Sequence, residues 1–368
     1  MYAEAAMRAR FAPRCAAVAA LACAACSGSI EPVISCDAVG SARPVCGFQN
    51  PEDLELLPDG TGLVVSEFGS MEGGRAGALS RLDLASESRT VLYRGGDGGS
   101  VTPGWGDPTC PGPPPPELSP HGIHLAARPD GAYQLLVVNH GGRESVELFE
   151  LEQTPAGWDL AWRGCAVAPA GVWMNEVVAL PEGGFLAAHM LPRRAGAGQL
   201  LEYAKAAVLG MRTGHVLEWQ PGRGFAPVPG TETRFANGIA LSRDGRTIFL
   251  NSSIGGKVHR IDRATGALEG SAEVPGPDNS SWAPDGRLLV ASFVGPLREN
   301  LACNEIERGA CPVAFQIVAV DPETLATETI YRGAGAPMGG GTVGLRVGDE
   351  LFIGSFAGDR VLRVQLPN

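Results

Sequence analysis

A hairpin of one design recurs six times along this 368-residue chain. In each copy a short strand leads into a turn that combines an acidic residue with glycine, and a more apolar strand follows. The six turns are Asp59-Gly60, Asp130-Gly131, Glu182-Gly183, Asp244-Gly245, Asp285-Gly286 and Gly348-Asp349. Asp-Gly between apolar runs predicts a β-hairpin, because glycine accepts the positive φ that such turns need. Repetition of this kind restricts the chain to the repeat architectures.

A third strand is expected after every hairpin. These strands are predicted at 78–84, 146–151, 214–219, 257–261, 316–320 and 360–366. Several of them alternate apolar with polar residues, as half-buried strands do. The spacing of the turns leaves room for a weaker fourth strand in each unit. The pattern therefore predicts an all-β fold, a six-bladed β-propeller with four-stranded blades around a central channel. The alternative, a β-sandwich, does not explain six repeats of one unit.

Two stretches interrupt the repeat. Residues 97–119 are rich in Gly and Pro and include four consecutive prolines, and residues 192–212 contain a predicted short helix at about 200–209. Both are long for plain connections. They are interpreted either as lids or rims over a site, or as surface insertions without a role.

The N-terminus has the pattern of an export signal. Arg8, Arg10 and Arg14 precede a small, apolar stretch at 15–26 that is too short to span a bilayer. Cys26 is a candidate lipidation and cleavage point, although Cys23 stands where a lipobox usually has leucine.

These features predict three parts: a signal peptide at 1–26, of lipoprotein type or not, an N-terminal segment at 27–49, and the propeller at 50–368. The protein is then exported to the periplasm or cell surface or secreted, with membrane attachment through an N-terminal lipid if Cys26 is modified. The alternative is a misassigned start that extends a cytosolic protein.

Cysteine usage also favours export. Beyond the leader there are six cysteines, and an even number in an exported chain indicates disulfides. Cys303 and Cys311 bracket a short loop and are the pair most strongly expected. The pairs Cys36–Cys46 and Cys110–Cys165 follow only by elimination among the fifteen connectivities that six cysteines allow. No two of these six cysteines have CxxC spacing, which argues against a zinc or redox site.

The net charge of −11 comes with scattered basic residues rather than a basic stripe. Nucleic acid is therefore not expected as a partner.

Polar side chains stand just before the first strand of each repeat. In a propeller the first strands line the central channel, so equivalent strand starts converge at one end of it. Carboxylate and amide oxygens are the hard ligands that Ca²⁺ prefers, whereas zinc takes more nitrogen or sulfur. We therefore predict one calcium in a ring of oxygens, and the alternative for any single residue is turn formation or capping. The predicted ligands are Glu52, Asn175, Asn237, Asp278 and Asn279.

Two histidines are candidates for catalysis. His121 begins the second repeat and should face the same channel, and His140 follows the next apolar strand. A second imidazole can fix the tautomer of the first and raise its basicity. The alternative is a structural role at strand ends. His189 and Met190 end the corresponding strand of the third repeat and are expected in the pocket wall, and the absence of a Gly-x-Ser-x-Gly motif disfavours a serine hydrolase.

These segments resemble the paraoxonase/arylesterase family, within the wider gluconolactonase, strictosidine-synthase-like and senescence-marker-protein-like propellers. The matching segments run in family order from about residue 50 to the C-terminus. They are EDLELLP at 52–58, PHGI at 120–123, LVVNH at 136–140, NEVVA at 175–179, FANGI at 235–239, DNS at 278–280, GTV at 341–343 and LFIG at 351–354.

The resemblance implies that the ring of five holds a catalytic calcium. It also implies a second, structural calcium at Asp53, the main-chain oxygen of Ile123 and the residue at 176. The family has Asp at that last position and this chain has Glu176, so the second ion is left open. His121 and His140 look like the family's proposed base and its helper.

The leading hypothesis is therefore a calcium-dependent hydrolase of lactones or aryl esters, with a small-molecule substrate. Two alternatives stay open, because a fold does not fix a function. One is a gluconolactonase-like sugar lactonase in which Asp or Asn is the base. The other is a non-catalytic propeller lipoprotein that binds a partner and keeps calcium for stability.

Overall fold

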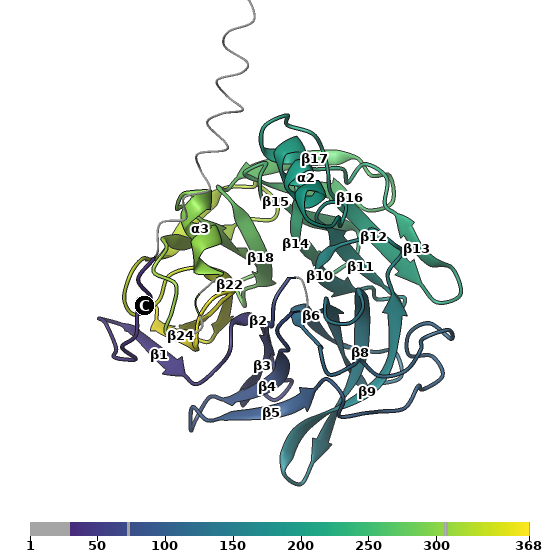
Figure 1. Ribbon diagram of the computed structural model, residues 1–368, viewed down its shortest axis with the longest axis horizontal. Helices are drawn as coiled ribbons and strands as arrows, with labels where there is room; N and C mark the ends of the chain where they lie inside the picture. The colour runs from purple at the N-terminus through teal and green to yellow at the C-terminus, as the bar shows by residue number, and fades with distance from the viewer. Residues whose placement is uncertain (1–29, 72–73, 305, 307, 368) are drawn as a thin grey trace, which may run out of the picture.

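A computed structural model describes residues 30–71, 74–304, 306 and 308–367. In this part of the chain, 24 strands form six four-stranded antiparallel sheets that surround a central axis (Figure 1). The predicted six-bladed propeller is confirmed. The predicted signal peptide and Cys26 lie outside the described residues.

The first five blades each follow the chain from the innermost strand outward. The first two contain β2 (Pro51–Leu56), β3 (Gly62–Glu67), β4 (Ala78–Asp83) and β5 (Arg89–Arg94), then β6 (Pro120–Ala127), β7 (Tyr133–Asn139), β8 (Ser145–Thr154) and β9 (Gly157–Val167). The third and fourth contain β10 (Met174–Ala179), β11 (Phe185–His189), β12 (His215–Gln220) and β13 (Gly224–Pro227), then β14 (Ala236–Leu241), β15 (Thr247–Ser252), β16 (Lys257–Asp262) and β17 (Leu268–Glu273). The fifth contains β18 (Pro277–Trp282), β19 (Leu288–Phe293), β20 (Phe315–Val320) and β21 (Thr327–Gly333).

The sixth blade joins the two ends of the described chain. Its inner strands are β22 (Gly341–Val347), β23 (Glu350–Ser355) and β24 (Arg360–Gln365), and its outer strand is β1 (Ala42–Cys46), which pairs with β24. Strand β1 therefore comes from the 27–49 segment that was predicted to precede the propeller. The buried Arg360 adds to this closure, because its guanidinium donates to the main-chain oxygens of Ser35 and Val33.

The six predicted turns are present, and the hydrophobic core lies between neighbouring blades. The glycine of each of the six predicted turns has a positive φ, between 62° and 96°. Both faces of each sheet pack against neighbours, which is why the inner strands are almost continuously apolar. Between the first two blades, for example, Leu57 and Val64 pack with Ile123, Val137 and Phe149 in one cluster.

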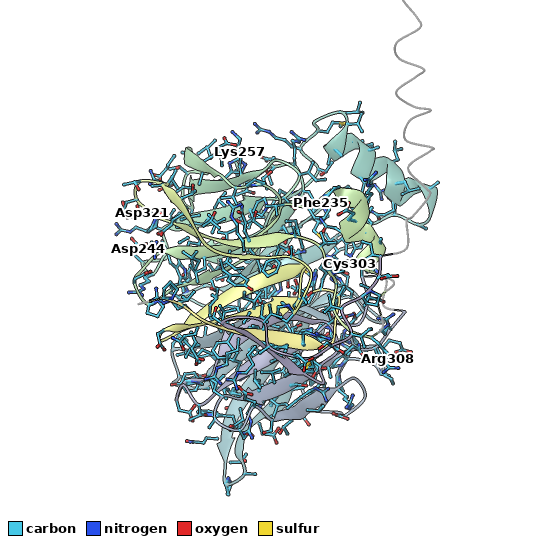
Figure 2. All side chains as sticks on the ribbon, turned by 90° about the vertical axis from the view of Figure 1, so that its left-hand side faces the viewer. Phe235, Asp244, Lys257, Cys303, Arg308 and Asp321 are labelled. Atoms are coloured by element: carbon cyan, nitrogen blue, oxygen red, sulfur yellow. A yellow bond between two sulfur atoms is a disulfide. The ribbon has the colours of Figure 1, made fainter. Side chains whose placement is uncertain are left out.

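Two helices lie in connections between second and third strands. Helix α2 (Ala197–Ala207) occupies the insertion where a helix was predicted, and α3 (Leu297–Cys303) was not expected. Figure 2 shows Phe235 and Cys303 on the side of the disc that carries both helices, and Asp244 and Asp321 on the other side. Among the described residues, neither helix has the length and apolar character that a membrane crossing requires.

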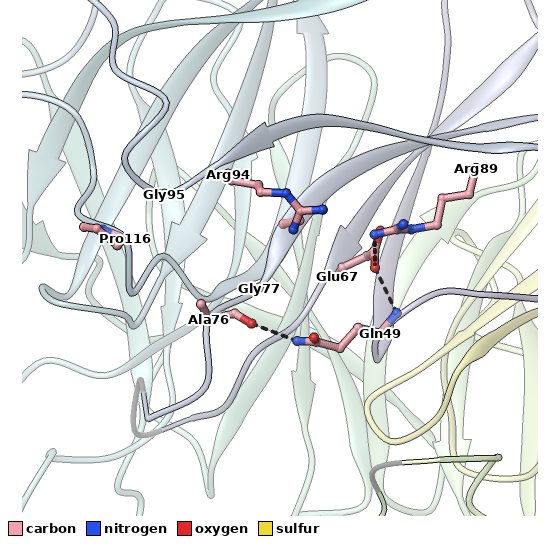
Figure 3. A pocket seen from close by; sticks show the side chains of 9 residues that line it. Gln49, Glu67, Ala76, Gly77, Arg89, Arg94, Gly95 and Pro116 are labelled. Carbon is pink, nitrogen blue, oxygen red and sulfur yellow. Dashed lines mark hydrogen bonds and ion pairs between the residues drawn. The ribbon is translucent and has the colours of Figure 1, made fainter.

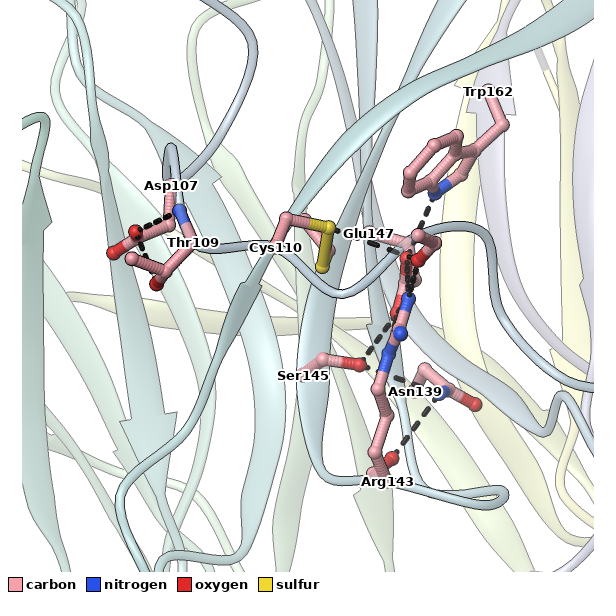
Figure 4. Close-up of a disulfide and its surroundings, with 10 residues drawn as sticks. Asp107, Thr109, Cys110, Asn139, Arg143, Ser145, Glu147 and Trp162 are labelled. Carbon is pink, nitrogen blue, oxygen red and sulfur yellow. Dashed lines mark hydrogen bonds and ion pairs between the residues drawn. A yellow bond between two sulfur atoms is a disulfide. The ribbon is translucent and has the colours of Figure 1, made fainter. Parts of the chain in front are cut away.

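The three predicted disulfides are all present, between Cys36 and Cys46, Cys110 and Cys165, and Cys303 and Cys311. The second of them ties the Pro-rich insertion to β9 (Figure 4). Trp105 and Leu118 of that insertion are buried, so the insertion packs against the second blade.

Candidate active site at one end of the channel

The first strand of every blade carries a β-bulge at the same place. The pairing of first with second strands shifts between Pro51 and Asp53, Pro120 and Ile123, Met174 and Val177, Ala236 and Ile239, Pro277 and Ser280, and Gly341 and Val343. A bulge breaks the strict alternation of side chains along a strand. This is why two consecutive polar residues can both be buried here, as Asp278 and Asn279 are.

Glycines allow neighbouring blades to approach at these bulges. A Cβ on Gly122 would lie 2.6 Å from the main-chain oxygen of Asn175, and one on Gly238 would lie 2.3 Å from that of Asp278. Real Cβ atoms do not come so close to backbone atoms. Gly122 and Gly238 follow His121 and Asn237 directly, so the same residues that position the polar side chains also bring the strands of adjacent blades together.

The structure buries all five predicted ring residues, each at 5% exposure or less. Asn279 donates from Nδ2 to Glu52 Oε1 at 2.8 Å, although 227 residues separate the two. The side chains of Asn237 and Asp278 also form a hydrogen bond. Asn175 contacts Met190, with 3.5 Å between its Nδ2 and the methionine sulfur.

Four of these five residues present a buried oxygen without a hydrogen-bond partner. The atoms are Glu52 Oε2, Asn175 Oδ1, Asn237 Oδ1 and Asn279 Oδ1. A buried polar atom that lacks a partner costs free energy, and such atoms in native proteins usually have an explanation. A hard cation supplies one, because carboxylate and amide oxygens are its preferred ligands.

Electrostatics favours the same interpretation. Burial, followed by the negative charge of Glu52, raises the pKa of Asp278 well above its ordinary value. A bound cation would offset both effects. The described residues contain no group of three or more His, Cys, Asp and Glu side chains arranged for a metal. The five predicted ring residues are two carboxylates and three amides.

A second pair of carboxyl groups lies beside the ring. Burial, and then the charge of Glu52, raise the pKa of Asp53 to about 7, and Asp53 forms a side-chain hydrogen bond with Glu176. Asp53 also accepts the amide hydrogen of Ile123 at 2.8 Å. Burial likewise raises the pKa of Glu176 well above its ordinary value. Three residues that the resemblance implied for a second ion are thus adjacent, and their acidic pair is costly to ionise without a cation.

The two predicted catalytic histidines are in direct contact. His121 Nδ1 lies 3.0 Å from His140 Nε2, and both residues are almost fully buried. The other nitrogen of His121, Nε2, lies 3.5 Å from Glu52 Oε1. Phe68 stacks on the His121 ring with 4.8 Å between centroids. The imidazole of His121 therefore has one edge on His140 and the other toward the ring of oxygens.

Sequence reasoning missed the residues behind His140. Its Nδ1 lies 2.9 Å from Glu144 Oε2, and Arg193 Nη1 donates to the same oxygen at 2.8 Å. Burial lowers the pKa of His140, and the Glu144 carboxylate opposes that effect. The only sequence signal was an acidic residue four positions after a candidate histidine, in a loop where no periodicity applies.

An apolar cluster lies next to Asn175, which contacts its member Met190. Trp173, Met190 and Leu191 are buried together, and Met71, Tyr203 and Phe235 pack against them. The place of Met190 and His189 in a pocket wall stays a prediction. His189 Nδ1 accepts the amide hydrogen of Trp173 at 3.0 Å.

A separate cavity of about 150 Å³ lies over the first blade (Figure 3). An ion pair between Glu67 and Arg89 occupies one side, and Gln49 donates to the main-chain oxygen of Ala76 at 2.9 Å. None of the predicted site residues lines this cavity. It is therefore distinct from the channel end.

Comparison with known proteins places this chain in a family. The sequence profile of the arylesterase family matches residues 108–363. The chain belongs to the arylesterase family. This confirms the resemblance found from the sequence, and the matched span includes every site residue named above except Phe68, Met71 and the Glu52-Asp53 pair.

Individual relatives agree with this membership. The chain is 27% identical over 223 residues to human serum paraoxonase/arylesterase 1, a match that covers 58% of this chain and 56% of that protein. The aligned region thus spans just over half the length of that relative. A solved structure described as a putative gluconolactonase superposes with a TM-score of 0.52 at 12% identity, covering 92% and 97% of the two chains. A gluconolactonase from Xanthomonas campestris gives 0.50 at 14% identity, with 93% and 96% covered. These two likenesses concern the fold.

Proposed function

We propose that this protein is a calcium-dependent hydrolase of lactones or aryl esters. The observation that carries the proposal is the His121–His140 hydrogen bond beside a ring of buried, unpartnered oxygens. Membership of the arylesterase family supports ester hydrolysis, and the name of the human relative includes the same activity. An export route, with or without a lipid on Cys26, fits the three disulfides, which persist in oxidising compartments.

Glu52, Asn175, Asn237, Asp278 and Asn279 would hold the catalytic calcium, and Asp53, Ile123 and Glu176 would hold a second ion. When bound, a divalent cation polarises a carbonyl oxygen and stabilises the negative charge that develops on it. The residues of the chain then have two tasks. They must orient an uncharged ester over the ring, and they must take a proton from the attacking water.

His121 is the proposed general base. Its Nε2 edge faces the ring, and the proton that it accepts would arrive 3.5 Å from the Glu52 carboxylate, which stabilises the imidazolium. Its Nδ1 edge is fixed by His140. Phe68 stacks on the imidazole of His121 and keeps water from that face of it. The apolar cluster around Trp173 would accept the acyl or aryl part of the substrate.

The test is a panel of aliphatic lactones, sugar lactones and aryl esters, assayed with calcium and with a chelator. The proposal predicts turnover that requires calcium and falls by about 100-fold or more in His121→Gln, as expected when a general base is lost. Turnover of sugar lactones that survives His121→Gln would favour the gluconolactonase-like alternative. A chelator that lowers the melting temperature, with no turnover of any substrate, would favour the non-catalytic binding protein.

A further inference from the structure

Glu144 is held as a hydrogen-bond acceptor on both of its oxygens. Its Oε1 accepts the amide hydrogen of Met174 at 2.7 Å, and its Oε2 accepts from Arg193 Nη1 at 2.8 Å. Neither a backbone amide nor a guanidinium can reverse its role as a donor. The carboxylate therefore has only accepting capacity left for the third group that it contacts, which is His140 Nδ1 at 2.9 Å.

This contact fixes the protons of the histidine pair. Because Glu144 can only accept, His140 carries its hydrogen on Nδ1 and leaves a lone pair on Nε2. His121 must then donate from Nδ1 across the 3.0 Å contact, so its own lone pair lies on Nε2. That nitrogen is the one directed toward Glu52. The opposite tautomer of His140 would place a hydrogen on Nε2 and reverse the polarity of the pair.

The loop that carries Glu144 is itself held at several points (Figure 4). Asn139 accepts the Gly141 amide hydrogen at 2.9 Å and donates to the main-chain oxygen of Arg143 at 3.1 Å. The Arg143 guanidinium donates to both oxygens of the buried Glu147, each at 2.9 Å, and to the main-chain oxygen of Gly112. The loop between β7 and β8 is therefore built to present one carboxylate at one place.

We propose that Glu144, clamped by Arg193 and by the Met174 amide, is the positioning residue of the histidine pair. It holds His140 in the tautomer that leaves His121 Nε2 free to accept a proton. The proposal rests on the proposed function for its catalytic consequence, but not for the tautomer itself. Arg193 belongs to the third blade and Glu144 to the second, so the clamp also fixes the pair across the boundary between two blades.

The first test reads the tautomer without any substrate. Nitrogen-15 NMR of ring-labelled protein distinguishes protonated from unprotonated ring nitrogens. Wild type should show a protonated Nδ1 and an unprotonated Nε2 on His140, and Glu144→Ala should show a mixture of tautomers. An unchanged His140 spectrum in Glu144→Ala, or a wild-type His140 protonated on Nε2, would overturn the proposal whatever the protein hydrolyses.

The second test reads catalysis with the best ester of the substrate panel. Glu144→Ala should lower kcat by about 10- to 100-fold with KM nearly unchanged, the usual range for residues that orient an active group. Glu144→Gln keeps one acceptor oxygen, so its loss of kcat should be smaller than that of Glu144→Ala. In a His140→Gln background, Glu144→Ala should have no further effect, because its target is gone. The control is Glu150→Gln, which removes a carboxylate paired with Arg163 on the same blade.

Outcomes separate the two proposals. Additive effects of the Glu144 and His140 substitutions, or a kcat loss in Glu144→Ala no larger than in Glu150→Gln, would refute the positioning role. If Glu144→Ala does not fold, Glu144→Gln carries both measurements. A protein without turnover of any ester, but with the predicted His140 spectrum and its change, would refute the proposed function and leave the tautomer assignment standing.

Discussion

Replacement of Asp278 by Asn should have opposite effects on stability with and without calcium. The two side chains have the same shape, and the amide oxygen can still accept the hydrogen bond from Asn237. Without a cation, burial and the charge of Glu52 make ionised Asp278 costly, so removing the charge should stabilise the fold. With calcium, Asp278 is one of two carboxylates in the predicted ring, so its loss should weaken binding.

The size of the calcium effect on stability follows from the linkage between calcium binding and unfolding. Calcium present at about 1,000 times its Kd stabilises the native state by roughly 4 kcal/mol. For a large domain, at about 2 °C per kcal/mol, this raises the Tm of the wild type by roughly 8 °C. Asp278→Asn should reduce the calcium-induced rise to less than about a quarter of that, since the site keeps only one formal charge. In chelator, each pKa unit by which Asp278 is raised is worth about 1.4 kcal/mol to the uncharged variant once the wild-type group is ionised.

The assay is differential scanning calorimetry at mildly alkaline pH, with calcium or with chelator. Asp285→Asn is the matched control, because Asp285 lies in the turn of the same blade, where hydrogen bonds from Arg287 lower its pKa. That control should leave the calcium-induced rise in Tm unchanged. If Asp278→Asn responds to calcium as fully as wild type does, or is less stable than wild type in chelator, the assignment of Asp278 to a cation site is wrong.

Three further predictions concern pH, packing and closure. Burial holds the pKa of Asp53 at about 7 against an ordinary 3.8, so between these two pH values the folded state keeps a proton that the unfolded state has lost. The stability of the calcium-free protein should therefore fall as pH rises from about 4 to about 7, by up to about 1.4 kcal/mol per pH unit, as measured by urea titrations. Gly238→Ala should destabilise by about 1–3 kcal/mol and reduce calcium affinity in calorimetry, because its Cβ would meet backbone, whereas Gly74→Ala has space and should be close to neutral. Replacing Cys36 and Cys46 by Ser should cost about 2–3 kcal/mol, as expected for a loop with a sequence separation of 10, and an unchanged urea midpoint would contradict a role in anchoring β1.

The sequence was sufficient for the blades because each hairpin is a local unit. An Asp-Gly turn such as Asp130-Gly131 and the apolar run after it are adjacent in the chain, so the pattern can be seen without knowing the fold. Each predicted ring residue likewise occupies one register position at a strand start, and the structure buries all five there, while their role as metal ligands stays a prediction. The regular bulge behind that register explains why neighbours such as Asp278 and Asn279 can both belong to the site.

Features that depend on distant contacts could not be predicted in this way. Strand β1 is only five residues long, contains a proline, follows no Asp-Gly turn and pairs with β24 near the other end of the chain, so nothing local marks it as part of the last blade. The role proposed for Glu144 depends on its contacts with Arg193, 49 residues later, and with the Met174 amide. Such contacts arise from the way the blades pack, and a pattern along one strand does not contain them.

The pairing of β1 with β24 also determines the order in which the molecule can be completed. The first strand of the propeller to leave the ribosome must wait for the last one, and more than 300 residues separate the partners Cys46 and Arg360. Five blades can form as the chain emerges, but β1 cannot pair as the outer strand of the sixth until β24 has been made. The Cys36–Cys46 disulfide joins residues only ten positions apart and can form early. The segment that contains β1 can therefore be cross-linked before β24 pairs with it. Ring closure is then the last step in forming the propeller, and a chain truncated just before β24 would leave two unpaired strand edges open to aggregation.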